Sequence, residues 1–175
     1  FYYKRSTRST GVLTGARCKA LRSMAVRSAG REPLFGTPKM SSFTLYNVRG
    51  CSKPLLAANI HALLLASPQS FRGQLQRLKD ALREHDGPVV LGGDFNTWSR
   101  TRAKILAEVI SSLGLRRVDF VPDTRTKVLG RPIDHVFTKG CVVRSAEVLS
   151  ASDSSDHRAL GVVIDCRNAS CAGTD

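Results

Sequence analysis

The pattern of apolar and polar residues predicts three strands in the first third of the chain. Residues 10–16 and 42–48 alternate between the two classes, and a short apolar run occupies 55–61. Such alternation is typical of a strand with one buried face. Glycine, cysteine and serine at 50–52 supply a turn between the second and third segments. We therefore predict a strand at 10–16 and a hairpin that pairs 42–48 with 55–61.

Two later segments repeat their apolar residues at the period of a helix. The first follows Ser67 and Pro68, and its apolar residues lie at 71, 75, 78 and 82. The second follows Ser99, and its apolar residues lie at 106, 109, 110 and 113, before Gly114. Serine often caps a helix, proline is favoured at its first position and glycine just beyond its end. We therefore predict two amphipathic helices, each with one face packed on a sheet.

The remaining apolar segments predict strands at 89–91, 116–120, 133–138, 142–149 and 159–164. In the last third strands outnumber helices, so these strands are expected to pair largely antiparallel. We predict an α+β (mixed α/β) domain at residues 1–166, with helices outside the sheets. The small polar segment 167–175 is expected to be a disordered tail.

Four short motifs place acids, amides and histidines at the ends of these strands. Rigid strands let such side chains converge with little reorganisation. Phosphodiester hydrolysis needs an activated water, a hard cation on the phosphate and a proton for the leaving oxygen. Carboxylates can hold the cation, and histidines can supply the proton. The motifs therefore indicate a metal-dependent phosphoesterase. They are Asn59-Ile60-His61, Gly92-Gly93-Asp94-Phe95-Asn96-Thr97-Trp98, Pro132-Ile133-Asp134-His135-Val136-Phe137 and Ser154-Ser155-Asp156-His157.

These motifs resemble those of the endonuclease/exonuclease/phosphatase superfamily, whose fold is that of DNase I. The resemblance runs from about Ser9 to Ile164. Residues 31–33 (Arg-Glu-Pro) resemble a segment of its secreted DNases, and residues 86–98 resemble its uncharacterised bacterial members. The resemblance implies a four-layer sandwich of two packed, mainly antiparallel sheets with helices outside.

Carried over residue by residue, the resemblance implies which residues act on the attacking water and which one holds the metal ion. Asp94 would orient and deprotonate the attacking water, and Asn96 would hydrogen-bond that water or a phosphate oxygen. Residues two apart in an extended segment point to the same side, which fits this pair. Asp156 would help to hold Mg²⁺ or Mn²⁺. Asp94 also has a structural interpretation as a helix cap.

The resemblance assigns the phosphate and the leaving group to other residues. His157 would contact the phosphate, with Asp134 accepting a hydrogen bond from its other ring nitrogen. His61 would protonate the leaving group, although a histidine at a strand end can equally be a core residue. Arg31 would bind phosphate. Packing roles are expected for three further residues of the motifs, Asn59, Trp98 and His135, with stacking on a substrate as the alternative for Trp98.

The sequence departs from the superfamily near its start. Members normally open with a strand that bears an asparagine and another that bears a metal-binding glutamate, and neither is found here. Glu32 is the single acid before Asp80, and its Arg-Glu-Pro context matches a different segment. We therefore expect an N-terminally truncated domain that is poorly active or inactive, because binding of a hard cation depends on ligand charge.

Charge is distributed unevenly along the chain. The net charge is +13, and residues 1–79 hold 14 Lys or Arg and one acid, whereas residues 80–175 hold 13 of each. A concentrated positive field attracts nucleic acid or another phosphorylated polyanion. A solvated basic face without a ligand is the alternative.

The cysteines and the hydropathy bear on the compartment. Five cysteines are scattered without a CxxC pair, so a disulfide framework or zinc site is not expected and reduced thiols are favoured. No apolar run approaches the ~20 residues that cross a bilayer. We expect a cytoplasmic protein, although a targeting segment upstream of Phe1 would change this. The oligomeric state is left open.

Three functions compete. The first is a divalent-metal nuclease, endo- or exonucleolytic. The second is a phosphatase or phosphodiesterase of lipid or sugar phosphates, which would use the same catalytic residues, because substrate choice in a shared fold lies in the loops. The third is a catalytically dead fragment that acts as a basic polyanion-binding module.

Overall fold

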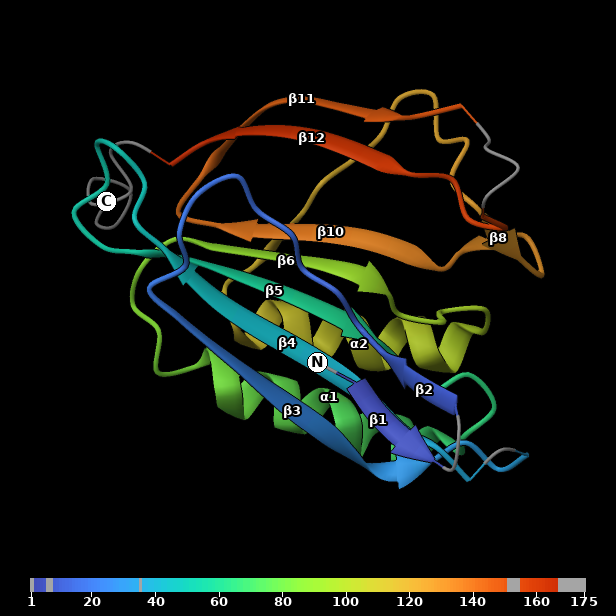
Figure 1. Ribbon diagram of the computed structural model, residues 1–175. Coiled ribbons are helices and arrows are strands. Elements are labelled where there is room, and N and C mark those ends of the chain that lie inside the picture. The colour runs from blue at the N-terminus through green and yellow to red at the C-terminus, as the bar shows by residue number, and fades with distance from the viewer. Residues whose placement is uncertain (1, 6–7, 35, 151–154, 167–175) are drawn as a thin grey trace.

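A six-stranded sheet forms the centre of the computed structural model, which describes residues 2–5, 8–34, 36–150 and 155–166 (Figure 1). The strand order is β3-β4-β5-β6-β10-β7. Strands β5 and β6 run parallel, while the other neighbours pair antiparallel. The strands span Arg22–Arg31 (β3), Pro38–Tyr46 (β4), Leu55–His61 (β5), Val89–Asp94 (β6), Arg116–Arg117 (β7) and Asp134–Lys139 (β10).

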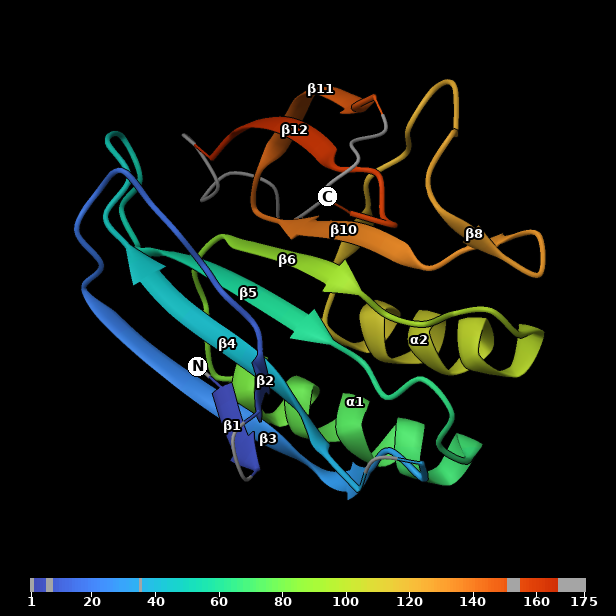
Figure 2. The ribbon, with the colours of Figure 1, turned by 45° about the vertical axis from the view of Figure 1, so that its right-hand side comes forward.

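Two helices, α1 (Pro68–Leu82) and α2 (Arg100–Ser112), cover one face of this sheet (Figures 1 and 2). Both predicted caps are confirmed, because the hydroxyl of Ser67 accepts from Ser70 N and that of Ser99 from Arg102 N. The predicted apolar faces are buried against the sheet, and together they form the core. Its fully buried side chains include Phe43, Leu91, Phe71, Leu75, Leu78 and Leu82.

Three pairs of short strands complete the fold. The β1–β2 hairpin (Tyr2–Arg5 and Arg8–Gly11) lies over β4, on the sheet face away from the helices, and β11 (Val142–Val148) pairs with β12 (Leu160–Asp165) beyond β10 (Figures 1 and 2). The small β8–β9 hairpin comprises Lys127–Val128 and Arg131–Pro132. The predicted α+β class with mainly antiparallel pairing is confirmed.

The N-terminal strand prediction is wrong. Residues 12–20 form no strand, and β2 already ends at Gly11. Side chains of the sheet hold this segment instead, since Asn59 Nδ2 donates to Leu13 O (3.0 Å) and the hydroxyls of Thr14 and Ser42 lie 3.0 Å apart. Strand β3 was not predicted, and the strand expected at 116–120 is limited to the two residues of β7.

The prediction of reduced cysteines is wrong for two of the five. Cys141 and Cys166 form a disulfide. They flank the first register pair of β11 and β12, Val142 opposite Asp165, so strand pairing brings them together across 25 residues of sequence. The expectation of a cytoplasmic protein therefore loses the observation behind it. Cys18 and Cys51 are free, and Cys171 and the predicted tail lie outside the described residues.

None of the helices in the described ranges is both long and apolar enough to cross a membrane.

Candidate active site

Strand register brings three of the predicted residues to one edge of the sheet. His61 lies opposite Asp94 across the parallel β5–β6 pair, and Asp94 lies opposite Asp134 across β6–β10. Gly93 makes the close approach of β5 and β6 possible. Its φ is +143°, and a Cβ there would lie 2.0 Å from the carbonyl oxygen of Ile60. The Gly-Gly before Asp94 therefore has a steric reason at its second position.

Asp94 and Asn96 form a compact turn. Asn96 N donates to Asp94 Oδ1 (2.8 Å), and its amide Nδ2 donates to Asp94 Oδ2 (3.0 Å) and to Ala62 O (2.9 Å). Asn96 is 3% exposed and has φ +49°, so the extended geometry expected for this pair is wrong. Both amide hydrogens are used within the protein. Asn96 therefore orients Asp94 and offers a substrate at most its amide oxygen.

The Asp94 carboxylate is largely shielded from solvent. Burial raises its pKa above the ordinary value, while the hydrogen bond from Asn96 N and the nearby His61 oppose part of the rise. A carboxylate with a raised pKa is a better proton acceptor than an exposed one. This environment fits the role of general base that the sequence suggested.

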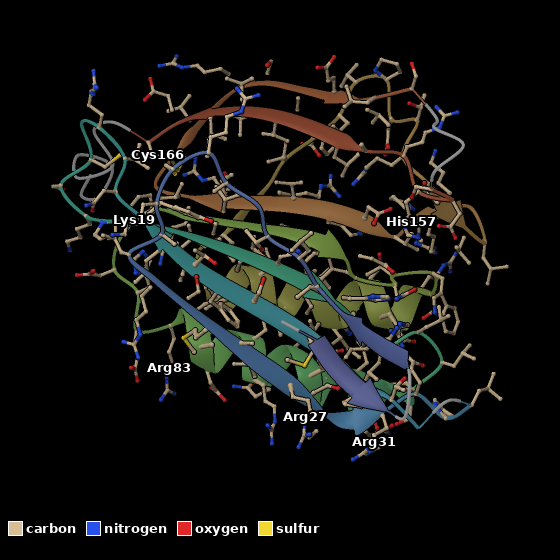
Figure 3. The ribbon with its side chains drawn as sticks, viewed as in Figure 1. Lys19, Arg27, Arg31, Arg83, His157 and Cys166 are labelled. Atoms are coloured by element: carbon tan, nitrogen blue, oxygen red, sulfur yellow. A yellow bond between two sulfur atoms is a disulfide. The ribbon has the colours of Figure 1, made fainter. Side chains whose placement is uncertain are left out.

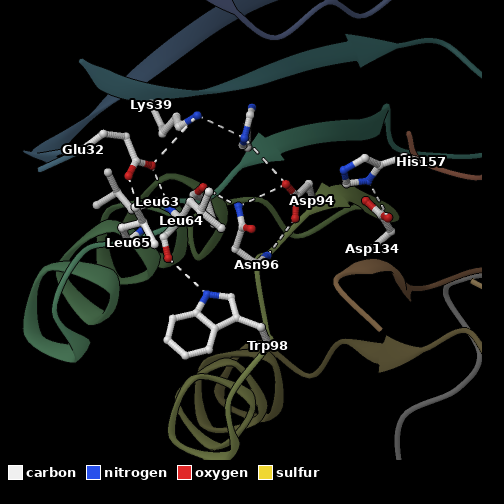
Figure 4. A network of polar contacts seen from close by, with 12 residues as sticks. Glu32, Lys39, Leu63, Leu64, Leu65, Asp94, Asn96, Trp98, Asp134 and His157 are labelled. Carbon is white, nitrogen blue, oxygen red and sulfur yellow. Dashed lines mark hydrogen bonds and ion pairs between the residues drawn. The ribbon is translucent and has the colours of Figure 1, made fainter. Parts of the chain in front are cut away.

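His157 and Asp134 are in direct contact, as predicted. His157 Nδ1 lies 2.7 Å from Asp134 Oδ2 (Figure 4). His157 N also donates to Ser155 Oγ at 3.1 Å. Burial lowers the pKa of His157, but the bond to Asp134 and its charge outweigh this, so the pKa is raised. The imidazole therefore carries positive charge more readily than a free histidine and leaves Nε2 for a phosphate oxygen.

His61 has a cationic neighbour that the sequence did not reveal. Lys39 Nζ lies 3.1 Å from His61 Nε2 and 3.9 Å from Glu32 Oε1, while the same His61 nitrogen lies 3.6 Å from Asp94 Oδ2. Burial and then Lys39 lower the pKa of His61. His61 is therefore neutral near pH 7, and the charged group beside the predicted leaving-group position is the Lys39 ammonium.

The backbone of residues 61–66, which follows β5, is held by side chains from distant elements (Figure 4). Glu32, only 4% exposed, accepts from Leu64 N (2.6 Å) and Leu65 N (3.2 Å). Gln74 of α1 accepts from Leu63 N (2.8 Å) and donates to His61 O (3.0 Å). Glu32 thus binds backbone amides here.

Arg102 completes this support from α2. Its buried guanidinium donates to Asn96 O (2.7 Å), Ala66 O (3.3 Å) and Leu63 O, and Trp98 Nε1 donates to Leu64 O (3.1 Å). The packing role expected for Trp98 fits this contact. Arg102 was missed, although it lies one turn before Leu106 on the apolar face of α2, where a charged residue is itself informative.

Arg31 lies outside this cluster, Asp156 adjoins it beside His157, and His135 has the packing role that was expected. Arg31 Nη1 donates to Gly36 O (2.9 Å) within its own turn, and Figure 3 shows Arg31 at the end of β3, apart from His157. Asp156 is exposed. His135 is buried and its Nε2 lies 2.7 Å from Thr97 Oγ1, so it packs between β10 and the Asp94 loop.

The residues in hand do not by themselves form a metal centre. Within the described ranges, no three His, Cys, Asp or Glu side chains are grouped so that they could hold an ion. Both Asp94 oxygens accept bonds from Asn96, and Asp134 is engaged by His157. Asp156 is thus one carboxylate available to Mg²⁺, which usually takes one or two carboxylates plus water and substrate oxygens.

Residues 6–157 match the endonuclease/exonuclease/phosphatase family. The chain belongs to this family. A UPF0294 protein of Vibrio cholerae serotype O1 is 38% identical over 144 residues, which are 81% of this chain and 50% of the relative. The chain thus spans about half the length of the curated relatives it matches.

Solved structures share the fold. An endonuclease/exonuclease/phosphatase from Bacteroides vulgatus superposes with a TM-score of 0.62 at 17% identity, over 84% of this chain and 66% of that one. A mannosyl-6-phosphatase from Bacteroides thetaiotaomicron gives a TM-score of 0.59 at 15% identity, over 84% and 67%. These likenesses establish the DNase I-like fold of the family.

Proposed function

We propose that this chain carries the water-activating and phosphate-binding part of a divalent-metal-dependent phosphoesterase that hydrolyses phosphodiester bonds of nucleic acid. One observation carries the proposal. The Asp94 carboxylate is fixed by two bonds from Asn96, while His157, whose pKa Asp134 raises, is bonded to Asp134 on the neighbouring strand. A positioned base beside a histidine that readily carries positive charge is what attack of water on a phosphate requires.

Each group then has a defined task. Asp94 accepts the proton of the attacking water, and Asn96 keeps the carboxylate in place. His157 donates Nε2–H to a phosphate oxygen and stabilises the charge that develops there. Lys39 stabilises the leaving oxygen, with neutral His61 hydrogen-bonded beside it. Mg²⁺ or Mn²⁺, with Asp156 as one carboxylate ligand, would supply Lewis-acid stabilisation of the phosphate.

The charge of the chain favours nucleic acid as the substrate. The net charge is +13, and a strongly positive protein concentrates a polyanion around it. A phosphatase of sugar or lipid phosphates is the second candidate, because the fold is shared with a mannosyl-6-phosphatase. The two candidates use the same water and phosphate chemistry and differ in what flanks the phosphate.

Hydrolysis of bis(p-nitrophenyl) phosphate with Mg²⁺, Mn²⁺ or EDTA tests the proposal. The assay compares the 175-residue chain with a longer form if the natural protein extends beyond it. Asp94→Asn should abolish metal-dependent release of p-nitrophenol, whereas Asp86→Asn, an exposed carboxylate paired with Lys53, should not. Equal loss in both variants, or turnover that survives Asp94→Asn, would contradict the proposal.

A matched binding measurement addresses the remaining function. A basic binding module without chemistry should bind oligonucleotides equally well in EDTA and with Asp94→Asn, and should show no turnover in any form of the protein. Turnover lost with Asp94→Asn excludes that possibility. Turnover that appears only in the longer form would confirm that the 175-residue chain lacks a part of the site.

A further inference from the structure

A cavity of about 550 Å³ adjoins His157, and Asp94 is not part of its lining. Two segments line it, residues 123–127 and residues 155–158, and it shares His157 and the proposed metal ligand Asp156 with the candidate active site. Figures 1 and 3 show His157 beside the β8 strand, at the same end of the molecule. The cavity therefore adjoins the proposed position of the phosphate at His157.

The wall of this cavity is a built structure. Arg125, 6% exposed, grips both oxygens of Asp123 (Nε–Oδ1 2.8 Å and Nη2–Oδ2 2.7 Å) and donates to Asp134 O (3.1 Å). This contact ties the wall to the strand that carries Asp134. Arg158 N donates to Thr126 Oγ1 (2.9 Å), which joins the two lining segments. The wall is thus held in a fixed position relative to His157.

The charges that face the cavity are mainly positive. Arg125 and Asp123 neutralise one another, and their contact holds the pKa of Asp123 down at about 2. Lys127 and Arg158 are exposed along the lining, and His157 adds positive character, whereas the acid left in the lining is Asp156, the proposed metal ligand. Lys127 Nζ donates to Asp123 O (3.2 Å) and so is directed along this wall.

We infer that this cavity binds the phosphate that neighbours the scissile one on a nucleic acid strand, through Lys127 and Arg158. The inference rests on the proposed function, since it takes His157 to mark the scissile phosphate. Phosphates repeat along each strand of a duplex about every 3.4 Å of rise, so a polynucleotide held at His157 necessarily presents another phosphate close by. The substrate class is therefore an oligo- or polynucleotide with at least two phosphates, and not a monoester.

Binding of a fluorescent single-stranded oligonucleotide in EDTA tests this without requiring turnover. The variant Lys127→Gln/Arg158→Gln is compared with Lys53→Gln/Arg83→Gln, which removes the same charge at the opposite end of the sheet, where Figure 3 shows Arg83. The salt slope of log K should fall by about 0.7 in the cavity variant, because the contact with one single-strand phosphate is lost. Equal slopes in the two variants would overturn the inference.

Two further measurements test the cavity independently of the proposed function and distinguish nucleic acid from anionic lipid as its ligand. If the protein is active, the rate on an oligonucleotide divided by that on bis(p-nitrophenyl) phosphate should fall at least tenfold in the cavity variant and stay constant in the control variant. An unchanged ratio overturns the cavity while leaving the phosphoesterase intact. Vesicles of anionic phospholipid are the other probe, and weaker vesicle binding with unaltered oligonucleotide binding would also overturn it.

Discussion

Arg102 is predicted to be a main stabiliser of the loop at residues 61–66, beside the candidate active site. Its side chain is 2% exposed, donates to three backbone carbonyls, and lies over the ring of Phe71 with its central carbon 3.9 Å from the ring centroid. Burial lowers its pKa to about 10, so it remains charged at neutral pH. Arg102→Ala removes these contacts together.

The expected loss of folding free energy follows from the three backbone carbonyls that lose their donor when Arg102 is removed. A buried carbonyl without a partner costs about 1–3 kcal/mol, and three would lose theirs. Removing the buried charge returns part of this, because a buried guanidinium has its own desolvation penalty. We therefore expect a net loss of roughly 3–5 kcal/mol, a large part of the about 5–15 kcal/mol that stabilises an ordinary domain.

Urea unfolding, followed by circular dichroism, measures this loss. Arg100→Ala is the matched control, because Arg100 is exposed and lies two residues earlier on the same helix. The control should change the free energy of unfolding by less than about 0.5 kcal/mol. If Arg102→Ala and Arg100→Ala unfold at the same urea concentration, the bonds described for Arg102 do not stabilise the protein and the reasoning fails.

Three further perturbations test the site. The raised pKa of His157 means that its ionised form stabilises the folded protein, fully below the unfolded pKa of about 6.5 and not at all above the folded pKa. His157→Gln should remove this stabilisation, so the urea midpoints of the two proteins should differ most at pH 5 and least at pH 9. A constant difference in midpoint across that range would contradict this. Lys39→Met should raise the pKa of His61, measured by NMR titration, because it removes a positive neighbour; an unchanged or lowered pKa would argue against the contact. Gly93→Ala should destabilise the protein severely, since its Cβ would meet a backbone carbonyl at 2.0 Å, whereas the nearest atoms to a Cβ at Gly92 are 3.9 Å away. Thermal melts in which Gly93→Ala and Gly92→Ala behave alike would refute the steric argument.

The helices and the ends of three strands could be predicted from the sequence, because interactions between residues close in sequence determine them. Both helix caps and both apolar faces were predicted because capping and the 3.6-residue period depend on neighbours in sequence. The strand ends that carry His61, Asp94 and Asp134 were predicted for a similar reason. A polar residue at the end of an apolar run indicates where a buried strand reaches the surface. The DNase I-like fold followed from the resemblance that those motifs carry.

Long-range contacts were not predictable in the same way. Glu32 is an acid in a basic segment, and only the folded chain shows that it binds the amides of residues 64 and 65. Lys39 became a site residue because β4 runs beside β5, which brings its ammonium to His61. The pairing of Cys141 with Cys166 depends on the register of two strands whose partner choice the sequence does not encode locally.

The support of residues 61–66 has a consequence for how this protein can change. Bonds from Glu32, Gln74, Trp98 and Arg102 fix the course of the backbone without using the side chains of Leu64 and Leu65, which are 40% and 50% exposed. Those two positions can therefore accept other side chains while the path of the loop is retained. A mutant library at these two positions would leave the Asp94 carboxylate and its turn in place and would test whether this loop sets substrate preference.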